Sequence, residues 1–181
     1  MLYITVPATR LWNEATEEFL FVPEQALQLE HSLVSLSKWE SKWCKSFLSD
    51  KAEKTDEQIL DYIRCMTLTQ NVNPLVYRCL SAENIRQINE YIAAPMTATT
   101  FGEDKSKNNK EIVTSELIYY WMIALQIPFE CQKWHINRLL TLIRVCNIKN
   151  APPGKGKSKR ELTSQYAAMN AARRKAHKTR G

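Results

Sequence analysis

The fold is decided by residues 29–47, which read Leu29-Glu30-His31-Ser32-Leu33-Val34-Ser35-Leu36-Ser37-Lys38-Trp39-Glu40-Ser41-Lys42-Trp43-Cys44-Lys45-Ser46-Phe47. Apolar side chains recur here at helical steps, at Leu29, Leu33, Leu36, Trp43 and Phe47. Trp39 partly fills the one gap in this series, at Glu40. The spacing predicts an amphipathic helix of about five turns, because residues three and four apart share one helical face.

The apolar face of this helix has two open interpretations. Its side chains can belong to the hydrophobic core, which is the usual place for tryptophan and leucine at helical spacing. They can also line a groove that accepts a helix of another protein, because such grooves use the same aromatic and aliphatic anchors. The sequence does not separate the two interpretations.

Two β-rich stretches precede this helix. Leu2–Val6 ends at Pro7, and Glu18–Val22 alternates between polar and apolar residues before it ends at Pro23. Together they predict an N-terminal hairpin with a loop between its strands. A lone hairpin is only marginally stable in water, so we expect the following helix to cover it.

More helices are predicted after residue 50. Thr55–Gln58 is a capping box that begins one helix, and Ser81–Asn84 opens another. A polar stretch without periodicity follows, and beyond it a helix that Pro128 ends and a helix over 130–145 form a helical hairpin. We therefore predict an α+β fold, mainly α, with a short β-hairpin packed on a helical bundle and a basic C-terminal helical tail.

Composition divides the chain into four parts. Residues 1–95 are expected to form an N-terminal α+β region, and residues 96–111 a polar linker or loop. Residues 112–148 are expected to form the helical hairpin, and residues 149–181 a basic tail with a short helix.

The tail carries the strongest functional signal. Residues 149–181 contain ten Lys or Arg and one acidic residue, Glu161, which gives a formal charge of +9. The whole chain carries +6, so residues 1–148 sum to −3. Such a tail is expected to meet an acidic partner. Protein capture is favoured, because Tyr166 alone could stack on single-stranded nucleic acid; nucleic-acid binding and an inert tail are the alternatives.

No catalytic or metal-binding pattern of similar strength is present. Gly156-Lys157-Ser158 matches the end of a phosphate-binding loop, but Ala151 stands where its first glycine is required. Cys131 and His135 are spaced like a pair of metal ligands, yet Cys146 is the only nearby third candidate. We expect no enzyme activity, no cofactor and no metal.

The chain is expected to work inside a cell without a membrane anchor. Its five cysteines are irregularly spaced, and its first residues lack the pattern of a signal peptide, which favours reduced thiols in a cytosolic protein. The longest nearly uncharged apolar run, residues 117–129, is shorter than the roughly 20 residues that span a bilayer.

A likeness to a known family covers nearly the whole chain. It is carried by Leu2–Pro7, Leu29–Ser41, Ser115–Met122, Ile127–Glu130, Trp134–Leu140 and Ala168–Lys175. In these stretches the chain resembles the tail assembly chaperones of long-tailed bacteriophages. Such chaperones are not enzymes. Their N-terminal region coats the long helical tape measure protein, and a C-terminal extension recruits tail tube subunits in the host cytoplasm.

The resemblance assigns roles to two groups of residues. The side chains expected to contact the tape measure protein are Leu29, Leu33, Leu36, Trp39 and Trp43. Those expected to contact the tube protein are Lys159, Arg160, Arg173, Arg174, Lys175, Lys178 and Arg180. Two other functions stay open: a virion structural protein of the neck or tail, and a nucleic-acid-binding accessory protein that acts through the tail. Oligomerisation also stays open.

Overall fold

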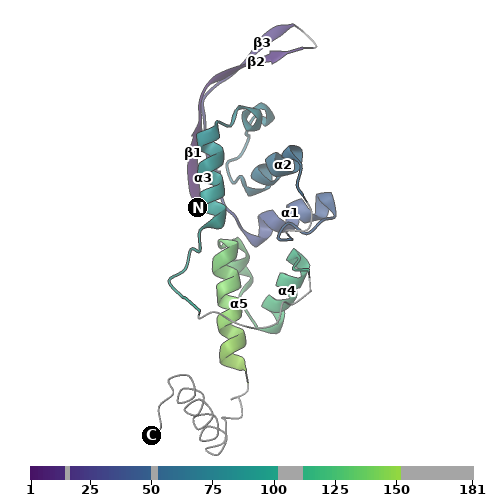
Figure 1. Ribbon diagram of the computed structural model, residues 1–181, viewed down its shortest axis with the longest axis vertical. Coiled ribbons are helices and arrows are strands. Elements are labelled where there is room, and N and C mark those ends of the chain that lie inside the picture. The colour runs from purple at the N-terminus through teal and green to yellow at the C-terminus, as the bar shows by residue number, and fades with distance from the viewer. Residues whose placement is uncertain (15–16, 50–52, 102–111, 152–181) are drawn as a thin grey trace, which may run out of the picture. The chain divides into compact units, whose positions relative to one another are not determined.

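The computed structural model describes residues 1–14, 17–49, 53–101 and 112–151 (Figure 1). Met1–Cys146 form one compact unit, and Asn147–Gly181 form a second. The elements are β1 (Leu2–Val6), β2 (Thr9–Asn13), β3 (Glu18–Val22), β4 (Gln25–Leu29), α1 (Leu33–Trp43), α2 (Asp56–Met66), η1 (Pro74–Cys79), α3 (Ala82–Ala93), α4 (Ser115–Ala124), η2 (Phe129–Lys133) and α5 (Ile136–Asn150). The predicted fold class, α+β and mainly α with an N-terminal hairpin, is confirmed. Within the described ranges, no helix has the length and apolar character to cross a membrane.

The N-terminal hairpin has four strands, so the predicted pairing of Leu2–Val6 with Glu18–Val22 is wrong. β1 pairs antiparallel with β4, and β2 pairs antiparallel with β3. Pro7 and Pro23 lie between the two ladders. Because proline has no N–H donor, it interrupts the ladder, and one long hairpin becomes two short sheets. Figure 1 shows β2 and β3 extending away from the helices of this unit.

Helix α1 is shorter than the helix predicted over residues 29–47. Ser32 caps its start, because the Ser32 hydroxyl accepts a hydrogen bond from the backbone N–H of Ser35. Leu29 lies on strand β4 instead, paired with Leu2 of β1. The helix ends at Trp43, since Cys44 adopts a left-handed conformation with φ of 50°.

The helix predicted over residues 130–145 also begins at a different place. Residues Phe129–Lys133 form the 3-10 helix η2, and α5 starts only at Ile136. Between them, His135 forms a β-bridge with Ser32, and the Ile136 N–H donates to the His31 carbonyl over 2.7 Å. This contact with a distant segment holds the backbone extended where the local pattern favours a continuous helix.

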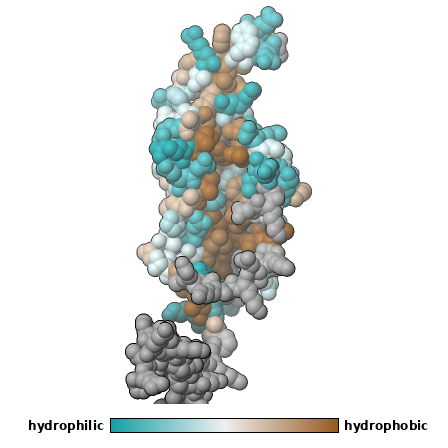
Figure 2. All heavy atoms as spheres, viewed as in Figure 1, coloured by the Kyte–Doolittle hydropathy of each residue, from teal (hydrophilic) through white to brown (hydrophobic). Residues whose placement is uncertain are grey.

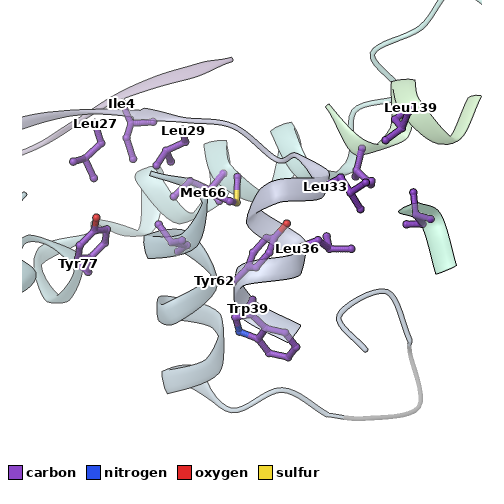
Figure 3. Packing of buried hydrophobic residues seen from close by; sticks show 14 of the residues in the cluster. Ile4, Leu27, Leu29, Leu33, Leu36, Trp39, Tyr62, Met66, Tyr77 and Leu139 are labelled. Atoms are coloured by element: carbon purple, nitrogen blue, oxygen red, sulfur yellow. The ribbon is translucent and has the colours of Figure 1, made fainter. Parts of the chain in front are cut away.

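The hydrophobic core gathers side chains from both sides of residues 96–111. Figure 3 shows Leu27 and Leu29 of β4 on one side of the cluster and Leu33 and Leu36 of α1 on the other, with Leu139 of α5 beyond Leu33. All five are almost completely buried. Helix α1 contacts α2, α4 and η2, whereas α3 contacts β1, so α1 is the element on which α2, α4 and η2 assemble.

Glu40 of α1 joins two distant segments through its buried carboxylate. One carboxylate oxygen accepts the Phe47 N–H over 2.9 Å, and the other accepts the Ser115 N–H over 2.7 Å. Ser115 is the first residue of α4, where the unpaired N–H groups and the helix dipole favour a negative charge. The carboxylate therefore anchors the start of α4 on α1.

Substitution Glu40→Ala is expected to lower the free energy of unfolding by about 3 kcal/mol, because it leaves the buried N–H of Ser115 and the partly buried N–H of Phe47 without acceptors. Chemical denaturation monitored by circular dichroism measures the loss. Glu116→Ala is the matched control, since Glu116 lies exposed in the first turn of the same helix and its loss costs about 0.5 kcal/mol. Equal losses for the two variants would show that the Glu40 contacts contribute nothing specific.

Candidate partner-binding groove

An apolar groove of about 520 Å³ opens between α2, η1 and α3. Its lining is mostly aliphatic and aromatic, and Asp56, Arg78 and Asn89 are its hydrophilic side chains. The apolar lining residues are Phe47, Ile59, Leu60, Tyr62, Ile63, Tyr77, Leu80, Ile85, Ile88 and Ile92. In Figure 2, apolar side chains run down the middle of the face on which Figure 1 shows α3 and α2, with hydrophilic side chains on both sides.

Local sequence fixes the two helices that form the walls. Thr55 caps α2 with Gln58, and Ser81 caps α3 with Asn84, each in a reciprocal capping box. The caps set the start of each helix and hence the direction of its apolar face. On α2 that face includes Ile59, whose side chain is 41% exposed at the groove.

Helix α3 contributes the opposite wall. Ile85, Ile88 and Ile92 recur at steps of three and four, so they lie on one face of the helix. Ile88 is fully buried beneath the groove, whereas Ile85 and Ile92 are partly exposed. Ile88 therefore anchors this wall in the core, and Ile85 and Ile92 give it an accessible apolar surface.

An aromatic stack closes one end of the groove. The rings of Phe47 and Tyr62 lie parallel, with centroids 3.7 Å apart. Burial raises the pKa of the Tyr62 hydroxyl, so this group stays protonated and hydrogen-bonds to Nδ1 of His31. Burial, with a smaller contribution from neighbouring His135, lowers the pKa of His31 to about 3. His31 and Tyr62 are therefore both neutral, and they are joined by a hydrogen bond beneath the groove.

Five residues are expected from the sequence to contact the tape measure protein, and most of them lie in the core. Leu29, Leu33, Leu36 and Trp39 are completely buried. Trp43 is partly exposed, and its indole N–H donates to the Asp61 carboxylate over 2.8 Å. In this structure the first of the two interpretations holds for the four buried side chains, and their role in partner binding stays a prediction.

The seven basic residues assigned to the second partner lie outside the described residues. They are Lys159, Arg160, Arg173, Arg174, Lys175, Lys178 and Arg180. The same is true of the short helix expected within residues 149–181, because the structure describes only residues 149–151 of this tail. Their proposed contacts therefore still rest on the sequence.

Cys131 and His135, which are spaced like a pair of metal ligands, lie in and next to η2. Cys131 is buried in η2, and burial raises the pKa of its thiol. His135 donates from Nε2 to the Tyr91 carbonyl over 2.9 Å, and its ring lies 5.0 Å from that of His31. Within the described ranges, no three His, Cys, Asp or Glu side chains are grouped closely enough to hold a metal ion.

Sequence periodicity predicts the apolar faces of the two helices that line the groove, but it does not predict a binding site between them. Ile59 and Ile63 on one helix, and Ile85 and Ile92 on the other, follow helical periodicity. Periodicity identifies a buried face, but it does not reveal that two such faces are held far enough apart to leave a gap. No sequence signal marks the separation of α2 and α3.

Comparison with known proteins assigns neither a family nor a function to the chain. No protein-family model, no curated protein and no solved structure matches the chain. The features that indicate a function are therefore the groove, the distribution of charge and the resemblance described above.

Proposed function

We propose that this protein is a non-catalytic tail assembly chaperone of a long-tailed bacteriophage and acts in the host cytoplasm. The apolar groove between α2, η1 and α3 binds an amphipathic helix of the tape measure protein. The basic residues of 149–181 recruit tail tube subunits. The observation that carries the proposal is the groove itself, an accessible apolar surface with few hydrophilic side chains.

The groove has the chemistry of a helix-binding site. An amphipathic helix that docks in this way inserts side chains at positions i, i+3 or i+4 and i+7 between aliphatic walls. The volume of about 520 Å³ lies within the range of roughly 300–1,000 Å³ that is typical of ligand pockets. The exposed part of Ile59 gives an incoming helix an apolar surface to cover.

The distribution of charge supports two separate partner contacts. Residues 1–148 sum to −3, whereas residues 149–181 carry +9. The groove offers burial of apolar surface, and the tail offers electrostatic attraction that steers an acidic partner and weakens with salt. Two contacts of different physical character suit a protein that holds one partner while it recruits another.

The groove variant Ile59→Asp is expected to reduce recovery of the tape measure protein at least tenfold in pull-downs from phage-infected cells. A carboxylate at this position would be desolvated by the docked helix, and a penalty of about 1.4 kcal/mol already weakens binding tenfold. Ile123→Asp is the matched control, because Ile123 is 62% exposed on α4 and does not line the groove. Recovery that is equal for the two variants would contradict the proposed groove.

A tail variant separates the second contact from the first. Replacing Arg173, Arg174 and Lys175 by serine is expected to remove the tube subunit while tape measure recovery is unchanged. Each lysate is divided and one half is treated with nuclease, because the alternative role in nucleic-acid binding predicts steeply salt-dependent binding that this variant weakens. Nucleic acid retained from the untreated half, with neither protein recovered from the treated half, would overturn the proposal. Presence of the protein in purified virions would favour the structural alternative.

A further inference from the structure

The sheet of β2 and β3 exposes an aromatic face. Trp12 and Phe19 are cross-strand partners, with their rings edge to face and 5.0 Å between centroids. Arg10 and Phe21 form the cross-strand pair two residues away, so they lie on the same face of the ribbon. The side chains of Trp12, Phe19 and Phe21 are 52%, 66% and 66% exposed. We call these four residues the arm face.

The opposite face of the ribbon is covered in part by the protein itself. Val22 is completely buried, and Leu11 is partly buried. Leu11 and Leu20 share the lining of a second cavity with Trp12 and with Leu75 of η1, and β3 contacts η1. The ribbon is therefore covered in part on its aliphatic side, where Leu20 stays 37% exposed, whereas Trp12, Phe19 and Phe21 keep more than half of their surface exposed within the described residues.

We propose that the arm face binds the arm face of a second copy of this chain. The surface complements itself, because it contains one cation, Arg10, beside three aromatic rings. A two-fold axis that runs across the strands, between the two cross-strand pairs, places Arg10 of each copy over Trp12 of the other. The same axis places Phe21 of each copy against Phe19 of the other. The contact thus consists of two cation–π pairs and two aromatic pairs, and it closes as a dimer.

The size of the arm face sets the expected strength of the dimer. Aromatic side chains bury about 150–250 Å² each when fully covered, so three half-exposed rings offer on the order of 350 Å² a copy. A stable interface of standard size buries about 800 Å² a partner. The expected dimer is therefore weaker than one of standard size, and its midpoint is sought at chain concentrations of about 10–100 µM.

Sedimentation velocity of the full chain tests the proposal over concentrations from about tenfold below to tenfold above this range. The wild type is expected to change from monomer to dimer. Arg10→Glu and Phe21→Ser are each expected to weaken the dimer at least about tenfold. Ile123→Ser removes an equally exposed apolar side chain from α4 and is expected to have no effect. A monomeric wild type, or equal effects of the arm and control variants, would overturn the proposal.

Cross-linking tests the two-fold arrangement, because it places Phe19 of one copy against Phe21 of the other. In a Cys44→Ser background, which removes the exposed native thiol, Phe19→Cys and Phe21→Cys chains are mixed and oxidised. The mixture is expected to form several times more disulfide-linked dimer than either variant alone. Equal yields from the single variants would refute the arrangement. The proposed groove does not include these residues, so either proposal can fail without the other.

Discussion

Replacement of Trp39 by alanine is expected to lower the free energy of unfolding by about 4 kcal/mol, close to the total stability of many small domains. Trp39 is completely buried in α1, and its ring meets the edges of Phe47 and Tyr62. Its indole N–H also donates to the Gln58 carbonyl over 2.8 Å, which ties α1 to α2. The variant loses buried apolar area, leaves a cavity and leaves a buried carbonyl oxygen without this donor.

The matched control for Trp39→Ala is the same substitution at Trp12. Trp12 is 52% exposed on β2, so its loss is expected to cost less than about 1 kcal/mol. Urea denaturation followed by far-ultraviolet circular dichroism compares the two variants without relying on tryptophan fluorescence. If Trp39→Ala were as stable as Trp12→Ala, the packing of α1 described above would be wrong.

Acidification from pH 7 to pH 5 is expected to lower the free energy of unfolding by about 2 kcal/mol through His31 alone. Burial lowers the pKa of folded His31 to about 3, whereas the pKa of histidine in an unfolded chain is about 6.5. In this window the unfolded state therefore binds a proton that the folded state excludes. Stability falls as the pH falls from about 6.5 towards 3, because the charged imidazole would face the Tyr62 hydroxyl, Phe47 and His135.

The variant His31→Gln isolates this effect. Glutamine does not titrate, so the loss of stability between pH 7 and pH 5 is expected to be smaller than in the wild type. It does not vanish, because burial also lowers the pKa of His135, which destabilises the fold in the same direction. Denaturation at several pH values measures the slope, and this range lies above the ordinary carboxylate pKa of about 4. Identical slopes in wild type and variant would contradict the lowered pKa of His31.

The hairpin illustrates what local sequence predicts and where it fails. Leu2–Val6 and Glu18–Val22 are strands as predicted, because their alternation and β-rich composition are local properties. The prediction that these two strands pair with each other is wrong, because it treats Pro7 and Pro23 as the ends of the strands. The chain instead continues past each proline as a second strand, β2 after Pro7 and β4 after Pro23. Which strands pair depends on how the two halves of the hairpin come together, and no single stretch of sequence specifies that.

The proposed sites show a similar division. The apolar faces of α2 and α3 follow from periodicity, but the gap between them follows from how α2, η1 and α3 meet. Leu33, Leu36 and Trp39 were candidates for both core and groove, and their complete burial places them in the core. The sequence pattern assigns no role to Trp12, because it does not predict a strand at Thr9–Asn13.

The fold class, the helices α2 and α3, and the separation of charge between residues 1–148 and 149–181 follow from the sequence alone. These properties depend on neighbouring residues, since caps, helical periodicity and charge counts need no distant contact. The pairing of the four strands, the late start of α5 beside His31 and the groove between two helices arise only in the folded chain. Each of these depends on contacts between segments distant in the chain, and such contacts can override local preference because they bury apolar surface and satisfy backbone hydrogen bonds.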